Sequence, residues 1–389
     1  MSVNTMSIEQ AYTLITALHE QATGETAITP TDLSSFVSVA QKTLQAGTEK
    51  VMNALSIVLT RTIIAVRPYE RKFSGLEVTA DRWGGLVRKI SFADQDPESD
   101  PTYALSATTY DPFVINKPTV LQTNYVGSVV WKKNYTQFTK NINDAFQNPQ
   151  AFGEWVSGLL TQMENEREQW LEEVARSSIA NMIAAKADGD ASNVIKLLTE
   201  YNAATGLSLT ATTVMQPANF KAFAAWAVSR IEEISRLMTE RSSLFQMKIT
   251  GYNINRHTPR ADQKVYLQAK FKEAFEKMVL ADTYHDNYLK LADNEGVSYW
   301  QAIDDPYTVS AKPVYINASG AVKVATANVV VENVIGVMFD RDAVGYNIYD
   351  QSVETSPYNQ SGQYFNLTSH ARVQLQNDLT EKFVVLQLA

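Results

Sequence analysis

The first 66 residues carry apolar side chains at the three- and four-residue spacing of amphipathic helices. Residues 7–10, Ser-Ile-Glu-Gln, form a capping box that predicts the start of a first helix, and Gly24 is suited to end it. Pro30 is expected at the first position of a second helix. A third helix is expected over residues 48–66, ending before a proline. These helices predict either a small bundle or an arm laid across other subunits.

From about residue 69 the pattern changes to that of strands. Residues 86–92 and 120–131 are rich in strand-forming side chains, and an acidic, turn-rich stretch at 94–101 lies between them. Together they predict a long two-stranded excursion with an irregular tip. Because an isolated hairpin is only marginally stable in water, the excursion is expected to lie on another surface.

The strongest single element is a long helix that begins near Asn148, a capping residue followed by Pro149. A helix of roughly 38 residues spans about 57 Å, which is longer than a compact domain usually needs. Trp170 is expected on its buried face together with apolar residues at helical spacing. The solvated face is expected to carry Glu154, Glu164, Glu166, Arg167, Glu168, Glu172, Glu173 and Arg176.

The remainder of the chain mixes helices and strands. A helix is predicted over 219–239, and a further helical stretch over 272–281. The predicted strands are 265–269, a hairpin of 314–316 with 322–324, and two apolar strands at 334–339 and 382–388.

The composition of the chain limits its possible functions but says little about its fold. The 389 residues are 45% hydrophobic, which is enough for two domains or for one domain with long excursions. The net charge of −8 predicts that the chain repels DNA rather than grips it. The sequence has no cysteine, and its four histidines are scattered without metal-binding spacing. Without a signal-like segment or a long apolar run, the chain is expected to be soluble and made in a cytoplasm.

A few residue groups are candidates for chemistry. Asp340 and Asp342 follow an apolar strand and have the oxygen ligands that Mg²⁺ prefers, but Arg341 between them can also pair with both. Trp83, before two glycines, is either a stacking residue or part of a backbone kink. Residues 256–260, with two arginines and a histidine, form either an anion site or a solvated loop. We find no catalytic constellation and expect no cofactor.

The order of these elements resembles the Hong Kong 97-type fold of tailed-bacteriophage capsid proteins, an α+β fold. Several stretches also resemble capsid proteins of phages that infect Gram-positive and gut bacteria. Each stretch is weak by itself and carries no chemistry, but their order extends over nearly the whole chain. The stretches are residues 85–90, 201–206, 216–221, 257–260 and 339–345.

The resemblance implies a division of the chain into named parts. An N-terminal helical arm would be more helical than the family minimum, which leaves its role open. The extended loop of the family, the E-loop, would follow it, and then a peripheral domain with a long spine helix and an axial domain. The expected bounds are 1–68 for the arm, 69–138 for the E-loop, 139–189 for the peripheral domain, 190–330 for the axial domain and 331–389 for the returning peripheral strands.

The same resemblance implies a major capsid protein that self-assembles into an icosahedral shell around a double-stranded DNA genome. The expected partners are copies of the chain in hexamers and pentamers, with portal, scaffold or decoration proteins as further possibilities. Sequence-specific DNA binding and membrane contact are not expected, and the protein would reside in the virion after assembly in the host cytoplasm. Two alternatives are an encapsulin-type compartment shell and a metal-dependent cytoplasmic enzyme that uses Asp340 and Asp342.

The polar tip of the two-stranded excursion and the overlong helix indicate a chain that is built to contact copies of itself. Some family members crosslink a Lys to an Asn with the help of a Glu, but no such trio is matched here, although Lys117 lies near the expected tip. We therefore expect a shell without covalent links that keeps its N-terminus. The candidate interface residues are Trp83, Arg88, Lys89, Asp96, Lys117, Trp170, Asp340, Arg341 and Asp342.

Overall fold

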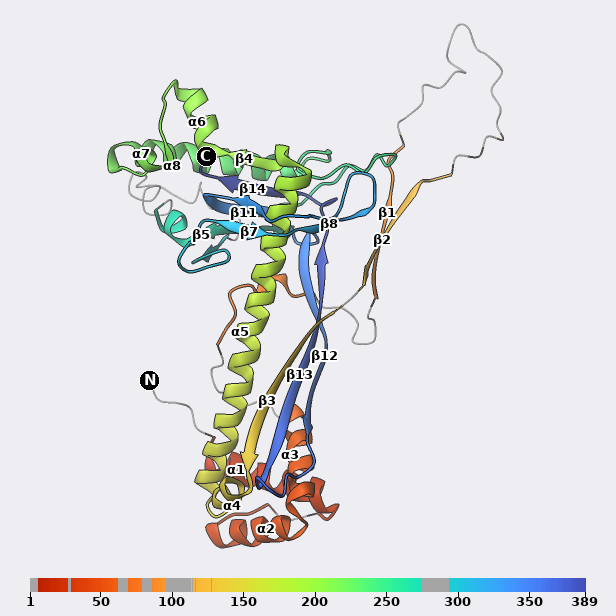
Figure 1. The fold of residues 1–389 in the computed structure, drawn as a ribbon, viewed down its shortest axis with the longest axis vertical. Coiled ribbons are helices and arrows are strands. Elements are labelled where there is room, and N and C mark those ends of the chain that lie inside the picture. The colour runs from red at the N-terminus through yellow and green to blue at the C-terminus, as the bar shows by residue number, and fades with distance from the viewer. Residues whose placement is uncertain are drawn as a thin grey trace. The chain divides into compact units, whose positions relative to one another are not determined.

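The computed structural model divides the chain into two compact units. Unit 1 comprises Met1–Gly85, Gly127–Val174 and Asn347–Gln374, and unit 2 comprises Leu86–Val126, Ala175–Tyr346 and Leu375–Ala389. Three long elements contribute residues to both units, namely α5 (Pro149–Gly189), β12 (Val344–Thr355) and β13 (Tyr364–Asn377) (Figure 1). The residues that the structure describes are 6–26, 29–61, 69–78, 86–95, 113, 115, 117–126, 128–274 and 294–389.

Unit 1 opens with α1 (Ile8–Thr23), α2 (Leu33–Gln45) and α3 (Thr48–Arg61). The predicted capping box of α1 is confirmed, and Gly24 ends that helix in the left-handed conformation, with φ 76°. The prediction that Pro30 begins the second helix is wrong. Asp32 caps α2 instead, because its carboxylate accepts the backbone N–H of Ser35 at 2.7 Å. The last residues of the third predicted helix, 62–66, lie outside the described residues.

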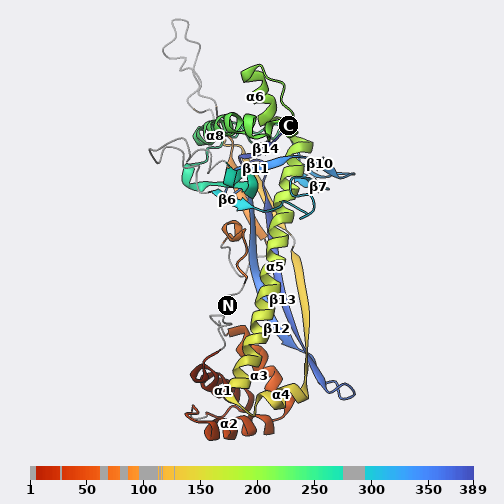
Figure 2. The same cartoon turned by 90° about the vertical axis from the view of Figure 1, so that its left-hand side faces the viewer.

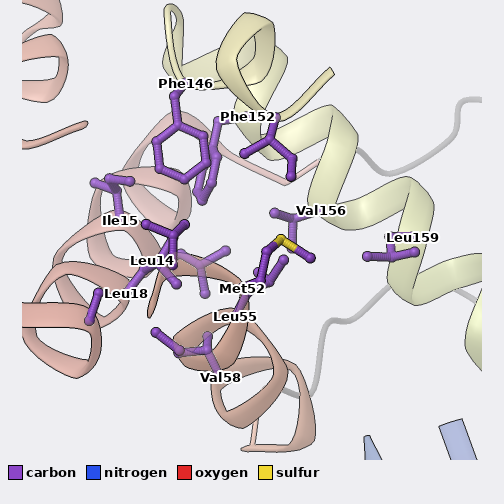
Figure 3. Packing of buried hydrophobic residues seen from close by; sticks show 14 of the residues in the cluster. Leu14, Ile15, Leu18, Met52, Leu55, Val58, Phe146, Phe152, Val156 and Leu159 are labelled. Carbon is purple, nitrogen blue, oxygen red and sulfur yellow. The ribbon is translucent and has the colours of Figure 1, made fainter. Parts of the chain in front are cut away.

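The three N-terminal helices form a bundle around the beginning of α5 and the short helix α4 (Thr139–Ala145) (Figures 1 and 2). Ile15, Phe36 and Phe152 are completely buried in one cluster, to which all of these helices contribute. Figure 3 shows Ile15 and Phe152 among the packed side chains of this cluster. A shared core of this size agrees with the bundle interpretation, since an arm laid across other subunits would bury these side chains on its neighbours and not on its own chain.

The rest of unit 1 is built on a three-stranded sheet of order β12-β13-β3, in which β3 (Val129–Phe138) pairs antiparallel with β13. Side chains alternate between two faces: Phe365 and Leu367 are buried, whereas Thr368 faces outward. The predicted strand over 120–131 is therefore two separate strands, because its last residues belong to β3.

Unit 2 is centred on a five-stranded sheet of order β4-β14-β11-β5-β6. Helix α8 (Pro217–Thr239) lies across one face, and its Phe223 and Ile231 pack in the cluster that includes Met338 of β11 (Figures 1 and 2). Every residue of β11 is buried, which is typical of a strand covered on both faces. The strands are β4 (Val194–Lys196), β14 (Phe383–Gln387), β11 (Val334–Asp340), β5 (Gln263–Gln268) and β6 (Asn294–Val297).

Among its described residues, unit 2 also has three two-stranded sheets. The two strands of the predicted excursion are confirmed as β1 (Leu86–Phe92) paired antiparallel with β2 (Val120–Val126), whereas most of its predicted irregular tip lies outside the described residues. The predicted hairpin is confirmed as β8 (Val314–Ile316) with β9 (Val322–Val324), and Gly320 supplies the left-handed turn residue at φ 80°. Further elements of unit 2 are β7 (Val309–Ala311), β10 (Val329–Val331), α6 (Leu197–Thr205) and α7 (Ala211–Val214). The expected helix over 272–281 is described only as far as residue 274.

Candidate assembly site

The β1–β2 ribbon has two chemically different faces. Directly paired residues of an antiparallel ladder share a face, so Phe92 lies beside Val120, and Lys89 lies beside Thr123. The first pair belongs to an open face, where Phe92 is 62% exposed. The second belongs to a covered face, where Thr123 is 8% exposed. The exposed apolar side chains of the open face are Ile90, Phe92, Val120 and Val126.

Side chains on the covered face of the ribbon take part in a network of charged groups. The amino group of Lys89 donates to Asp378 Oδ2 at 2.7 Å and to Glu381 Oε1 at 2.5 Å. On the adjacent side, Arg256 donates to the hydroxyl of Ser91 at 2.7 Å, and its Nε lies 3.3 Å from Glu381 Oε1. Two cations thus face two carboxylates whose side chains are only 3% and 7% exposed. The network is neutral overall, which makes its burial tolerable.

Burial and charge act against each other on these groups. Burial by itself would lower the pKa of Lys89, but the charges of Asp378 and Glu381 outweigh it and hold that pKa above its ordinary value. Burial would likewise raise the pKa of Asp378, yet Lys89 and the hydrogen bonds of Thr380 hold that pKa below its ordinary value. For Glu381 burial dominates, and its pKa is raised. Lys89 and Asp378 therefore form a charged pair at neutral pH.

A second anchor lies where β1 ends. The backbone N–H of Asp94 donates to the carbonyl of Asn253 at 2.5 Å, and its carboxylate accepts the N–H of Asn255 at 3.0 Å. The same carboxylate pairs with Arg241. Asp94, which the sequence places in the acidic stretch of the excursion, is therefore an anchoring residue of unit 2.

The expected interface residues do not converge on one site. Lys89 is half-buried in the charge network, and its neighbour Arg88 is exposed on the open face. Lys117 is exposed, and its carbonyl lies 3.4 Å from Gln95 Nε2. The expected burial of Trp170 is only partly correct, because this side chain is half-buried and stacked on another tryptophan. Two of the candidates, Trp83 and Asp96, lie outside the described residues.

In the acidic turn after β11, the first carboxylate accepts hydrogen bonds from groups of the same chain. The carboxylate of Asp340 accepts the hydroxyl of Thr258 at 2.7 Å and the backbone N–H of Asp342 at 2.8 Å. Arg341 lies 3.1 Å from Asp262 and 3.7 Å from Asp342. Of the two pairings that the sequence leaves open to Arg341, the structure has the one with Asp342, whereas Asp340 is buried and engaged elsewhere. Within the described ranges no three His, Asp or Glu side chains gather as a possible metal site.

The loop at 256–260 also differs from an anion site. Arg256 is engaged by Glu381, and Arg260 pairs with Glu232. Because both guanidinium groups already face carboxylates, their charge is compensated within the chain.

A second exposed apolar surface belongs to the β8–β9 hairpin. Val314, Val322 and Val324 lie on its outer face, with exposures of 47%, 70% and 58%. The opposite face is fixed to the end of α5, where Tyr315 donates to Asp188 Oδ2 at 2.7 Å and Lys323 donates to the same atom at 2.8 Å. The hairpin was predicted from the sequence, but its outward apolar face was not.

Sequence reasoning did not identify the partners of Lys89. Asp378 and Glu381 stand in a short acidic segment before a buried strand, a position where solvated turn residues are common. Their contacts join segments almost 300 residues apart in the chain. The only local signal was the lysine on an alternating strand, which is shared by many solvated strands.

Solved phage capsid structures share this fold. The capsid structure of Staphylococcus phage Andhra matches with a TM-score of 0.52 and 11% identity, covering 84% of this chain and 87% of the other. A chain in the structure of head fiber and inner core protein gp22 of bacteriophage P68 matches with a TM-score of 0.56 and 12% identity, over the same shares of the two chains. The fold is therefore the Hong Kong 97-type fold of phage capsids, as the resemblance implied.

A family model assigns the chain to one family among the proteins that share this fold. The family model for Phi29-like phage major capsid proteins matches residues 15–387, and the chain belongs to this family. No curated protein sequence matches the chain. It is a structural protein of the virion with the role of major capsid protein. In the part of the chain that the structure describes, no helix is long and apolar enough to cross a membrane.

Proposed function

We propose that copies of the chain assemble into an icosahedral shell of hexamers and pentamers around double-stranded DNA. In this shell the β1–β2 ribbon of each copy docks on a neighbouring copy. The observation that carries this proposal is the open face of the ribbon, with Phe92 62% and Val126 77% exposed. In this strand pair one face packs on its own subunit and the other exposes apolar side chains to water. Such an exposed face is typical of a surface that another chain covers.

The named parts of the fold follow from this proposal. We propose that the N-terminal bundle, the spine helix α5 and the strands β12 and β13 make the peripheral region. Residues 190–330 would make the axial domain together with β11 and β14, which pair with β5 and β4. Within the expected E-loop, β3 pairs with β13 in unit 1, so we place the protruding arm at Leu86–Val126. Arg88 and Lys117 are exposed on this arm and remain interface candidates, as do the exposed Arg341 and Asp342.

The charge of the chain supports enclosure of DNA without specific binding. The formal net charge is −8, and a surface of that sign repels the phosphate backbone. We propose that the shell confines the genome within the virion, has no enzymatic activity and assembles in the host cytoplasm. Portal, scaffold or decoration proteins would bind other surfaces of the same shell.

The docking proposal is tested by placing a charge on the open face. Phe92→Asp buries a carboxylate in the proposed interface and is expected to prevent particle formation, whereas Asn124→Asp puts the same charge on the same face at a position that is already polar. Sedimentation and negative-stain microscopy of both variants, expressed together with any scaffold, would measure assembly. Circular dichroism would confirm that both fold. Particles of normal size and yield from Phe92→Asp would contradict docking through this face.

A further inference from the structure

Charged and polar side chains hold the β1–β2 ribbon to the rest of unit 2. Lys89 and Ser91 point toward the body of the unit, whereas Arg88, Ile90 and Phe92 point away, as strand alternation requires. The two inward side chains meet Asp378, Glu381 and Arg256, which lie outside the ribbon. The covered face of the ribbon therefore contains a polar joint, beside the half-buried Val87, Leu121 and Tyr125.

A joint of this kind permits few orientations. The carboxylates of Asp378 and Glu381 are nearly inaccessible to water, so moving Lys89 away would leave buried negative charge without its partner. An apolar contact could slide by a residue at small cost, but two charge-assisted hydrogen bonds from one amino group fix both distance and direction.

We infer that Lys89 is a positioning residue of the β1–β2 ribbon. Its bonds to Asp378 and Glu381 set the angle at which the ribbon extends from the rest of unit 2. The anchor at Asp94 extends the same attachment to the end of β1. The consequence for assembly rests on the proposed docking of the ribbon on a neighbour. A ribbon that leaves each subunit at one angle presents its open face in the same place on every copy.

The charges around the joint determine the choice of variants. Lys89 and Arg256 balance Asp378 and Glu381, and Lys186 of α5 also acts on Asp378. Lys89→Met removes one cation from this set. Lys89→Met with Glu381→Gln removes one charge of each sign. Arg256 and Asp378 then still balance each other, while both hydrogen bonds from Lys89 are lost. The double variant serves if the single one does not fold.

The test is a distance measurement within the dispersed full-length subunit. Because the chain has no cysteine, Asn124→Cys and Ala225→Cys provide two unique spin-label sites, both exposed, one on the ribbon and one on α8. Pulsed electron resonance on this pair is expected to give one narrow distance distribution. Lys89→Met, alone or with Glu381→Gln, is expected to broaden that distribution by about twofold, as for a segment released from its local contacts.

Two controls separate charge position from charge loss. Arg88→Met removes a cation from the adjacent, exposed position, and Lys89→Arg keeps the cation in place; both are expected to retain the narrow distribution. An unchanged distribution in Lys89→Met and in the double variant would overturn the inference. That result is independent of docking, which fails only if Phe92→Asp subunits still assemble.

Discussion

Lys89 Nζ and Asp378 Oδ2 lie 2.7 Å apart, although 289 positions separate the two residues in the chain. Lys89 belongs to the β1–β2 ribbon, and Asp378 belongs to the turn that leads into β14, the neighbour of the central strand β11. The pair joins the ribbon, whose opposite face is apolar and exposed, to the segment before a buried strand. Folding of the C-terminal segment and placement of the ribbon are therefore coupled through one ion pair.

Stability should reveal this coupling directly. Lys89→Met is expected to lower the free energy of unfolding by about 2–4 kcal/mol, because two buried carboxylates lose their closest cation while Arg256 compensates only part of the charge. Arg88→Met, on the exposed face, should change it by less than about 0.5 kcal/mol. Urea unfolding of dispersed subunits measures both. Similar losses for the two variants would mean that Lys89 has no special role in unit 2.

The spine helix needs a different set of predictions from the one that its sequence pattern gives. Leu171 is completely buried, and Leu171→Ala should cost about 2–5 kcal/mol. Trp170 is half-buried against Trp131, with ring centroids 6.0 Å apart, so Trp170→Ala should cost only about 1–2.5 kcal/mol. Thermal unfolding of the two variants measures the order of these effects. A larger loss at Trp170 than at Leu171 would contradict this assignment of the faces.

The glutamates of the same helix are not uniformly solvated. Glu168 accepts two hydrogen bonds of 2.9 Å from Arg71, so Glu168→Ala should cost about 1–3 kcal/mol. Glu173 is exposed and provides the control, with an expected change of less than about 0.5 kcal/mol. The expectation of a solvated face was wrong for Glu172, which is 5% exposed and accepts the hydroxyl of Tyr69 at 2.5 Å, and for the buried Arg176.

The elements of this fold were more predictable than their surfaces. Local signals such as the Ser7 capping box and the Asn148-Pro149 helix start were sufficient for α1 and α5, because each acts within one turn. The Pro30 start failed because Asp32, two residues later, satisfies the free N–H of Ser35 directly. Which charged residues are buried depends on partners far away in the sequence, and neither spacing nor residue type gives that information.

The N-terminal helices should behave as core and not as a detachable arm. Phe36 is completely buried between rings of α1 and α5, with centroids 6.0 Å from Tyr12 and 6.0 Å from Phe152. Phe36→Ala should therefore cost about 3–5 kcal/mol, whereas Leu33→Ala, at a side chain 55% exposed, should cost less than about 0.5 kcal/mol. Calorimetry of the full-length chain distinguishes them. Equal and small effects would indicate that the bundle contributes little to unit 1.

Lys186 predicts a pH dependence of stability. It is completely buried in α5, donates to the carbonyl of Phe245 at 3.1 Å, and has a pKa that burial lowers from 10.5 to about 8. Between these values the unfolded chain binds more protons than the folded one. This group therefore makes stability rise with pH, by up to about 1.4 kcal/mol per pH unit.

The contribution of Lys186 is isolated by substitution. Lys186→Met should remove this part of the rise in unfolding free energy above pH 8, whereas Lys196→Met, at an exposed position, should keep it. Urea titrations across the window compare the slopes of the two variants, so effects on absolute stability cancel. A slope in Lys186→Met equal to that of the wild type would show that this lysine titrates normally.

The mature shell is expected to be held without covalent bonds and to retain its N-terminal helices. The sequence has no cysteine, which excludes disulfides, and no Lys, Asn and Glu trio for an isopeptide bond is matched in it. Removal of α1–α3 would expose Phe152 and Val156, both fully buried in the bundle core. Purified particles boiled in detergent should therefore release one band near 43.4 kDa. A ladder of multimers would contradict the non-covalent shell, and a shortened chain with a new N-terminus inside the bundle would contradict retention of the helices.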